Sequence, residues 1–193
     1  MNNLARRGFI FGSATLVSYG LLVGVQRVCF SAFADAQPDY ASTGAVTIVQ
    51  FADDGSRLGA RSVAKLNRTN QEWKKLLTPA QYEVTRRAAT EFAYSGNLYD
   101  QHSPGLYRCA CCETALFDSA TKFDSGTGWP SFWAPLDNAV GTVRDNTLGM
   151  ARIAVHCRRC GGHLGHVFND GPPPTGLRYC MNGFAMMFKP ATA

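Results

Sequence analysis

Apolar residues recur at helical spacing in the segment that ends near residue 90. Two capping boxes, each a threonine followed three residues later by Glu or Gln, begin at Thr69 and Thr78. Such boxes satisfy the free N–H groups at a helix start, and Pro79 suits a first helical position. The pattern predicts two helices, the second running to about Thr90. The expected inward-facing positions of this second helix are Tyr82, Val84 and Ala88 or Ala89.

From Gly105 onward, short apolar runs are separated by glycine, proline and aspartate. This pattern is typical of short antiparallel strands in a small sandwich or barrel, and it indicates no long helix. Upstream, residues 46–51 are rich in β-formers and precede a turn at residues 53–55, whereas residues 37–45 are small, polar and loose. The pattern predicts a mainly β (α+β) domain with its helices near the N-terminal side.

The composition is that of one ordinary soluble domain with additional segments, at 193 residues and 46% hydrophobic. The formal net charge is +5, of which three arginines and one aspartate in residues 1–36 contribute +2. The remaining charge of about +3 is diffuse and contains no Lys/Arg run. Nucleic-acid binding is therefore not indicated.

The N-terminus has the features of an export signal. A twin-arginine pattern, Arg6-Arg7, precedes an apolar stretch that ends near Val25, and A-x-A sites allow cleavage after Ala34 or Ala36. We expect residues 1–36 to be a twin-arginine signal peptide that directs an already folded protein to the periplasm. Cleavage would leave no stable membrane insertion. The alternative is a protein anchored in the membrane by an uncleaved N-terminus.

Two C-x-x-C pairs predict a metal site. Cys109 with Cys112 and Cys157 with Cys160 provide four thiolates, the ligand set of a closed tetrahedral structural site. Zn²⁺ is the expected metal, with iron as the competitor and disulfides as the alternative in an oxidising compartment. Cys111 is spare in the first pair. We expect each pair to end a different strand pair, so that the metal clamps those strands together.

A further cysteine lies outside this set, at Cys180, two residues after Arg178. A nearby cation lowers the pKa of a thiol and so favours the nucleophilic thiolate. The alternatives are an inert buried cysteine and an arginine engaged in a surface ion pair. A metal clamp together with a reactive thiol favours a redox enzyme.

Several separate motifs resemble the B-type methionine-R-sulfoxide reductases, from about Leu66 to about Lys189. They are Gly126–Phe132, Gly162–Phe168, Asp170–Pro172 and Arg178–Asn182, with a lead-in at Glu72–Pro79 and Tyr94–Gly96. The resemblance implies two packed antiparallel sheets with N-terminal helices and a structural zinc. It also implies a reductase domain at residues 66–193, which leaves residues 37–65 as a loose N-terminal extension with a short strand.

The resemblance implies an activity and partners as well. A thiolate attacks the sulfoxide sulfur of the R epimer, takes the oxygen as a sulfenic acid and releases methionine, after which a thiol reductant regenerates the enzyme. The expected substrates are proteins that contain methionine sulfoxide, or the free amino acid. The expected reductant is thioredoxin-like, and the expected state of the enzyme is a monomer.

The resemblance assigns roles to individual residues. Cys180 is the nucleophile, assisted by Arg178, and His166 is the candidate proton donor to the sulfoxide oxygen, with structural roles or zinc ligation as alternatives for the histidines. The remaining expected site residues are His163, which shapes the pocket, Asn182, which orients oxygen or water, Trp129, which holds the methyl group unless it is a core aromatic, and Phe168, a pocket wall.

One position departs from the family pattern. Family members often carry a resolving cysteine where this chain has Thr127. Two hypotheses follow: Cys111 is an alternative resolving cysteine, or an external reductant attacks the sulfenic acid directly. The segment Gly183–Ala185 also differs from the family pattern. The rival functions are a non-catalytic zinc module that binds a partner and a general disulfide oxidoreductase.

Overall fold

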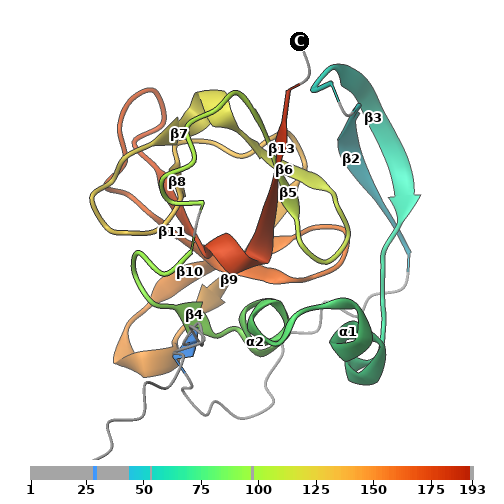
Figure 1. The fold of residues 1–193 in the computed structure, drawn as a ribbon, viewed down its shortest axis with the longest axis horizontal. Coiled ribbons are helices and arrows are strands. Elements are labelled where there is room, and N and C mark those ends of the chain that lie inside the picture. Colours follow the sequence, from blue (N-terminus) through green and yellow to red (C-terminus); the bar gives the residue numbers. More distant parts are fainter. Residues whose placement is uncertain (1–27, 30–43, 53, 97, 192–193) are drawn as a thin grey trace, which may run out of the picture.

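Two antiparallel sheets form the body of the protein, as Figure 1 shows. The structure is a computed structural model that describes residues 28–29, 44–52, 54–96 and 98–191. The strands of the larger sheet are β7 (Lys122–Phe123), β8 (Ser131–Phe132), β9 (Val140–Asp145), β10 (Arg152–Cys157), β11 (His163–Phe168) and β12 (Arg178–Met181). The spatial order of these six strands is β7-β8-β12-β11-β10-β9.

The smaller sheet has three strands and packs against the larger one. It consists of β5 (Gly105–Cys109), β6 (Ala115–Asp118) and β13 (Met186–Pro190), in the order β13-β5-β6. Phe117 of β6 stacks on Phe132 of β8 with 4.4 Å between ring centroids, and Tyr107 of β5 meets the same ring at 4.8 Å. All three rings are fully buried, and burial of such aromatic area is a main source of stability. The predicted pair of packed antiparallel sheets is confirmed.

Two α-helices cover one end of the sheets (Figure 1). They are α1 (Asn70–Leu76) and α2 (Pro79–Arg87), and each begins with the predicted capping box. Helix α2 ends earlier than Thr90, because Ala88 adopts a left-handed backbone conformation with φ of 53°. Tyr82 and Val84 face the core as predicted, but Ala88 is exposed and Ala89 only half-buried. Thr85 is the third buried position of this helix.

The segment before the helices holds more structure than one short strand in a loose extension. Strands β2 (Ala45–Phe51) and β3 (Arg57–Ala64) form an antiparallel hairpin beside the smaller sheet (Figure 1). The expected strand is β2; β3 was missed because it is exposed along most of its length and its sequence shows no apolar alternation. The Arg108 guanidinium of β5 donates to the carbonyls of Phe51 and Ala52 at 3.1 Å each, which ties the hairpin to the domain.

Short elements complete the chain. A two-residue strand β1 (Val28–Cys29) pairs with β4 (Thr90–Glu91). Three single turns of 3-10 helix are η1 (Ser119–Thr121), η2 (Thr147–Gly149) and η3 (Gly183–Ala185). The described residues after Arg87 contain no α-helix, as predicted. In the described part of the chain, no helix has the length and apolar character needed to cross a membrane.

Candidate active site and metal centre

Four cysteine sulfurs meet where the two sheets come together. Cys109 ends β5 and Cys112 lies in the turn before β6, whereas Cys157 ends β10 and Cys160 lies in the turn before β11. Their Sγ atoms all lie within 4.8 Å of one another, and two pairs are 3.6 Å apart. Four thiolates around one tetrahedral metal at ~2.3 Å require sulfur–sulfur distances of about 3.8 Å. The arrangement therefore fits a four-coordinate metal with no position left for a substrate.

The two cysteine pairs join different sheets, as expected. The first pair connects β5 to β6 of the smaller sheet, and the second connects β10 to β11 of the larger sheet. Neighbouring segments hold the second turn in place: Leu66 N–H donates to Arg159 O at 2.8 Å, and Arg86 of α2 donates to Cys160 O at 3.0 Å. A bound metal would staple the sheets to each other beside the helices.

Cys180 lies in the middle of the six-stranded sheet. Its partner across the β11–β12 pair is His166, and its partner across the β12–β8 pair is Ser131. Directly opposed residues of an antiparallel pair project from the same face of the sheet. His166, Cys180 and Ser131 therefore form one row, with the sulfur between an imidazole and a hydroxyl.

The surroundings of Cys180 act on its pKa in two directions. Burial raises the pKa of the thiol above its ordinary value, and it outweighs the opposing effects of the Arg178 charge and of hydrogen bonds with Thr127, Ser131 and Arg178. Arg178 does act to lower the pKa of Cys180, as expected, but its effect is smaller than that of burial. Because the net shift is upward, the resting group is the thiol, and its proton has to be moved when it reacts.

Arg178 is held by two neighbours, the Asp170 carboxylate and the Phe168 ring. Its Nε and Nη2 donate to the two carboxylate oxygens of Asp170 at 2.9 and 2.8 Å, a bidentate ion pair. Its guanidinium carbon lies 4.5 Å from the centroid of the Phe168 ring. The hydrogen bond to Asp170 raises the pKa of Arg178, so the guanidinium stays charged beside Cys180. Both an ion pair and a role at the thiol are thus present in one side chain.

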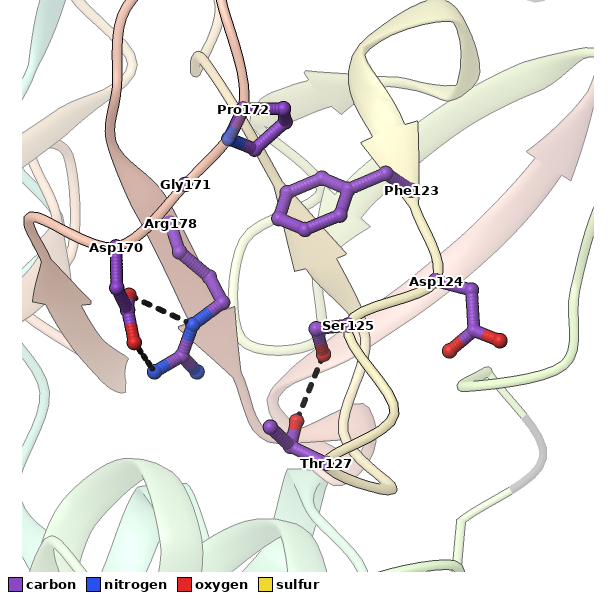
Figure 2. Close-up of a pocket in the computed structure, with 8 residues that line it drawn as sticks. All are labelled: Phe123, Asp124, Ser125, Thr127, Asp170, Gly171, Pro172 and Arg178. Carbon is purple, nitrogen blue, oxygen red and sulfur yellow. Dashed lines mark hydrogen bonds and ion pairs between the residues drawn. The ribbon is translucent and has the colours of Figure 1, made fainter.

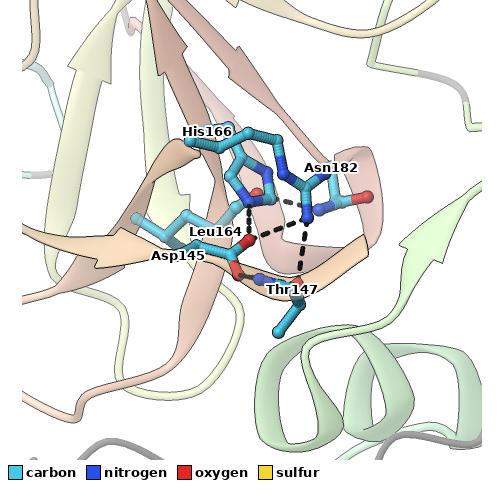
Figure 3. Close-up of polar contacts among 6 residues, drawn as sticks. Asp145, Thr147, Leu164, His166 and Asn182 are labelled. Atoms are coloured by element: carbon cyan, nitrogen blue, oxygen red, sulfur yellow. Dashed lines mark hydrogen bonds and ion pairs between the residues drawn. The ribbon is translucent and has the colours of Figure 1, made fainter. Parts of the chain in front are cut away.

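His166 belongs to a charged cluster shown in Figure 3. Its Nε2 lies 2.8 Å from Asp145 Oδ2, which also accepts from Arg152 at 2.7 Å, while Thr147 donates twice to Asp145 Oδ1. Burial lowers the pKa of His166, and the Asp145 hydrogen bond opposes that effect. Burial also acts to raise the pKa of Asp145, but the Thr147 and His166 hydrogen bonds win and hold it well below its ordinary value. The cluster thus keeps a carboxylate against the imidazole.

His163 lies next to His166, and its Nε2 atom is buried. The two rings are 5.4 Å apart, and His163 Nε2 has no hydrogen-bond partner among the described residues. Burial, followed by the His166 charge, lowers the pKa of His163 to about 3. The ring is therefore neutral at any ordinary pH, which suits the expected role of shaping the pocket.

Asn182 and Trp129 are both anchored by backbone groups of the buried residue Glu91. Asn182 Oδ1 accepts from Glu91 N–H at 3.0 Å, and its Nδ2 donates to Leu164 O at 3.1 Å, a bond drawn in Figure 3. Trp129 Nε1 donates to Glu91 O at 3.2 Å, which leaves the indole face available. An amide nitrogen has two protons, and the bond to Leu164 uses one of the two N–H groups of Asn182 Nδ2.

The Glu91 carboxylate itself holds the turn that follows Cys180. It accepts from Gly183 N–H at 2.6 Å and from Phe184 N–H at 2.9 Å, at the start of η3. Burial raises its pKa, and these two N–H groups oppose the rise. Glu91 thus positions the segment that carries Asn182.

A cavity of about 420 Å³ lies between two loops. Figure 2 shows Arg178 and Asp170 on one side and Ser125 and Thr127 on the other. Two of its lining residues, Thr127 and Arg178, interact with Cys180 and act to lower the pKa of its thiol. The full set of lining residues is Phe123, Asp124, Ser125, Thr127, Asp170, Gly171, Pro172 and Arg178.

Thr127, at the usual resolving position, and Cys111, the alternative resolving cysteine, lie in different places. Thr127 interacts with Cys180, whereas Cys111 lies next to Cys160, Thr85 and Arg86 at the metal centre. The structure therefore brings Cys180 together with a hydroxyl, and it groups Cys111 with the metal ligands.

Several residues of the site were not expected from the sequence. They are Glu91, Ser125, Ser131, Asp145, Thr147, Arg152 and, as the partner of Arg178, Asp170. Ser131 and Asp170 lie inside the motifs quoted above, so those motifs carried a signal for them. Asp145 and Arg152 flank the turn between β9 and β10 and have no motif of their own, and only the β9–β10–β11 pairing brings them to His166.

The fold and the site define a class: a two-sheet β protein with a closed four-cysteine metal centre and a separate buried thiol flanked by arginine and histidine. Comparison with known proteins agrees. The SelR domain family matches residues 77–190. Three relatives are called "Peptide methionine sulfoxide reductase MsrB": those of Thioalkalivibrio sulfidiphilus (54% identical), Pseudomonas savastanoi (55%) and Agrobacterium fabrum (52%). The matches cover 64–65% of this chain and 90%, 97% and 94% of those proteins.

The chain therefore belongs to the SelR family, the B-type methionine-R-sulfoxide reductases. The matched segment contains both cysteine pairs and Cys180, whereas the β2–β3 hairpin lies before it.

Proposed function

We propose that this protein reduces the R epimer of methionine sulfoxide to methionine, with Cys180 as the nucleophile. The observation that carries this proposal is the row His166–Cys180–Ser131 with Arg178 against the sulfur, in a chain that belongs to this family. Protein-bound and free methionine sulfoxide are both substrates in this proposal.

The first half-reaction moves one oxygen and one proton. The Cys180 sulfur attacks the sulfoxide sulfur, the oxygen passes to Cys180 as a sulfenic acid, and methionine leaves. His166 donates a proton to the sulfoxide oxygen, which makes the sulfoxide sulfur more electrophilic. The Asp145 carboxylate favours the protonated imidazole that this step requires. The Cys180 thiol loses its own proton in this step, and that proton replaces the one that His166 has given up.

Selection of the R epimer falls to the groups around the sulfur. In this proposal the face of Trp129 holds the apolar S-methyl group, and the neutral ring of His163 and the second N–H of Asn182 Nδ2 are the polar groups opposite it. Phe168 does not line the cavity of Figure 2 itself, but its ring packs against the Arg178 guanidinium that does. An R sulfoxide can then place its methyl group on the indole while its oxygen points to His166.

The metal at the four cysteines is Zn²⁺ in this proposal, because a closed tetrahedral sulfur site suits that ion. Its contribution is structural: it holds the β5–β6 turn to the β10–β11 turn. No coordination position is left for a sulfoxide, so the metal takes no part in the reaction.

Regeneration proceeds in this proposal by direct attack of an external, thioredoxin-like thiol on the sulfenic acid. Thr127 has no sulfur to form an internal disulfide, and Cys111 lies among the metal ligands. Replacing Cys111 with serine tests the alternative. Unchanged multiple turnover with a thioredoxin-like donor would exclude Cys111 as a required resolving cysteine.

The decisive experiment measures turnover of the chain from Gln37 onward on separated R and S epimers of a methionine-sulfoxide peptide, with a dithiol as reductant. Cys180→Ser runs beside it, and Cys111→Ser is the matched cysteine control. Activity confined to the R epimer and lost in Cys180→Ser is the expected result. A folded, metal-loaded protein without activity would contradict the proposal and favour a partner-binding module, and activity on disulfides alone would favour a general oxidoreductase.

We also propose export by the twin-arginine route and action in the periplasm, as a monomer. Support comes from the Arg6-Arg7 pattern and the A-x-A sites, which lie outside the described residues. The test is fractionation of cells with N-terminal sequencing of the product, and light scattering gives the oligomeric state. Full-length protein in the cytosol with its N-terminus intact would contradict export.

A further inference from the structure

Three hydroxyl groups lie in a continuous chain beside the Cys180 sulfur. Ser125 Oγ is 2.8 Å from Thr127 Oγ1 and 2.7 Å from Ser131 Oγ, and Ser131 Oγ donates to Trp129 O at 3.2 Å. Ser131 is 1% exposed and is the β8 partner of Cys180. Hydrogen-bond interactions with Thr127 and Ser131 act to lower the pKa of the Cys180 thiol. The trio therefore connects the reactive atom to solvent, because Ser125 and Thr127 line the cavity of Figure 2.

The loop that carries Thr127 is held firmly. Tyr94 N–H donates to Gly128 O and the Tyr94 hydroxyl donates to Gly126 O, both at 2.8 Å. A Cβ on Gly128 would lie 2.7 Å from the Tyr94 ring, and both glycines have left-handed φ angles of 68° and 83°. Thr127 is thus fixed between two clamped glycines, and its hydroxyl is presented in one place.

The proton count of the trio allows two directions. Each hydroxyl has one proton to donate and can accept as well. When Cys180 is a thiol, it can donate to Thr127, which donates to Ser125, then to Ser131 and on to Trp129 O. When the group at Cys180 needs a proton, Ser125 donates to Thr127 and Thr127 donates toward the sulfur. The same contacts serve both states by rotation of hydroxyls alone.

The trio and His166 stand on opposite flanks of the sulfur. His166 is on the β11 side and has its Nε2 engaged by Asp145, whereas the hydroxyls are on the β8 side and reach the cavity. Arg178 is engaged by Asp170 and stays protonated, so it cannot supply a proton. Of the Ser125, Thr127 and Arg178 side chains that line the cavity, only the two hydroxyls can therefore supply a proton.

We propose that Ser125, Thr127 and Ser131 form a proton relay that protonates the departing oxygen of the Cys180 sulfenic acid when an external thiol attacks through the cavity. This inference rests on the proposed function and concerns its second half-reaction. The thiolate sulfur forms an S–S bond to Cys180 as the S–O bond breaks, and the oxygen leaves as water with the proton from Thr127. Ser125 then reprotonates Thr127 and takes a proton from solvent in the cavity.

A second thiol of the same class completes the regeneration of Cys180. Its thiolate attacks the reductant sulfur of the mixed disulfide, releases Cys180 and forms the disulfide of the reductant. The Cys180 sulfur is reduced by two electrons, and two thiols are oxidised. Thr127 thus takes the position of a resolving cysteine and supplies a proton where that residue would supply a sulfur.

The test separates the two half-reactions. Thr127→Val keeps the shape and removes the hydroxyl, whereas Thr127→Ser keeps the hydroxyl. Enzyme is first mixed with methionine sulfoxide without reductant, and the release of methionine is measured. The sulfenic acid is then reduced with dithiothreitol or with thioredoxin, and its disappearance is followed by dimedone trapping. We expect Thr127→Val to slow the second step at least about tenfold more than the first, and Thr127→Ser to restore it.

Three results would overturn the relay. Equal slowing of both half-reactions in Thr127→Val would indicate a merely structural effect. Slowing with thioredoxin but not with dithiothreitol would assign Thr127 to docking of the protein reductant. An unchanged second step in both Thr127→Val and Ser125→Ala would exclude the hydroxyls. Failure of the wild-type enzyme to release methionine in the first step would instead contradict the proposed function itself.

Discussion

Cys180 and His166 face each other directly across the β11–β12 pair. The sheet, and not a flexible loop, therefore sets the distance between the thiol and the imidazole. Asp145 on β9 completes the arrangement with a 2.8 Å contact to His166 Nε2. A functional group carried on paired strands is held more precisely than one on a loop, so small changes in this row should have measurable kinetic effects.

Replacing Asp145 with asparagine should weaken the first half-reaction. Removal of the carboxylate lowers the pKa of His166, because the Asp145 hydrogen bond now opposes the effect of burial. If the protonated imidazole is required, the fall in rate with rising pH moves to lower pH, and the rate at neutral pH drops by about 10- to 100-fold. Single-turnover rates measured from acid to neutral pH check this. Asp137→Asn, at an exposed aspartate paired with Arg57, is the control and should show the wild-type profile.

Replacing Glu91 with glutamine should destabilise the domain. One carboxylate oxygen that now accepts from Gly183 or Phe184 N–H would become an amide NH₂, so two donors would face each other in a buried place. The free energy of unfolding should fall by about 1–3 kcal/mol. Urea denaturation measures this change. The same substitution at Glu83, which is partly exposed on α2, should change stability by less than about 0.5 kcal/mol, and an equal loss at both sites would contradict a special role for Glu91.

The two cysteines of the first turn should respond differently to substitution. Cys112→Ser removes one of the four ligands, so the purified protein should lose its metal, and its melting temperature should fall by about 10 °C or more. Cys111→Ser leaves all four ligands in place and should keep the metal. Elemental analysis and calorimetry on the two variants provide the measurement. Retention of a full metal equivalent by Cys112→Ser would mean that the four-cysteine site is wrongly assigned.

The β2–β3 hairpin should protect the metal centre. Arg108 lies on β5, the strand that ends at Cys109, and removing residues 44–64 breaks its two hydrogen bonds to Phe51 and Ala52. The truncation also exposes the surface against which Val46, Ile48 and Val49 are buried. At about 1 kcal/mol for each hydrogen bond, release of the metal to a chelator should be about tenfold faster or more. A chromogenic chelator follows the release. Ser62→Ala, on the exposed strand β3, is the control, and equal release rates for truncated and complete protein would refute the protection.

Stability should depend on pH through His163. Its pKa is lowered from 6.5 to about 3 in the folded protein, so the unfolded chain binds the proton more readily between these values. Stability is therefore fully present above about pH 6.5 and is lost as pH falls toward 3, by up to about 1.4 kcal/mol for each pH unit. In His163→Gln this part of the pH dependence should disappear. Denaturation curves at several pH values in this window, for both proteins, show whether the slopes differ.

The capping boxes, the cysteine pairs and the motifs around Trp129, His166 and Cys180 carried most of the predictable information. Capping is local chemistry, so the starts of both helices were predicted correctly, whereas the end of α2 depended on the left-handed turn at Ala88. The strand β3 had no pattern of its own and exists because it pairs with β2. The predicted loose extension with one short strand therefore lacked the second strand of the hairpin.

The amino-acid sequence was enough to predict the chemistry: four thiolates in two close pairs, a separate cysteine two residues after an arginine, and a family pattern with threonine at one position. Residue type and short spacing are enough for that, because ligands and reactive groups are properties of single side chains and tight turns. Only the tertiary structure decided which groups meet. Asp145 reaches His166, Glu91 holds the turn after Asn182, and Ser125 links Thr127 to Ser131 through strand register and loop packing. Such contacts join residues far apart in the chain, and no local pattern encodes them.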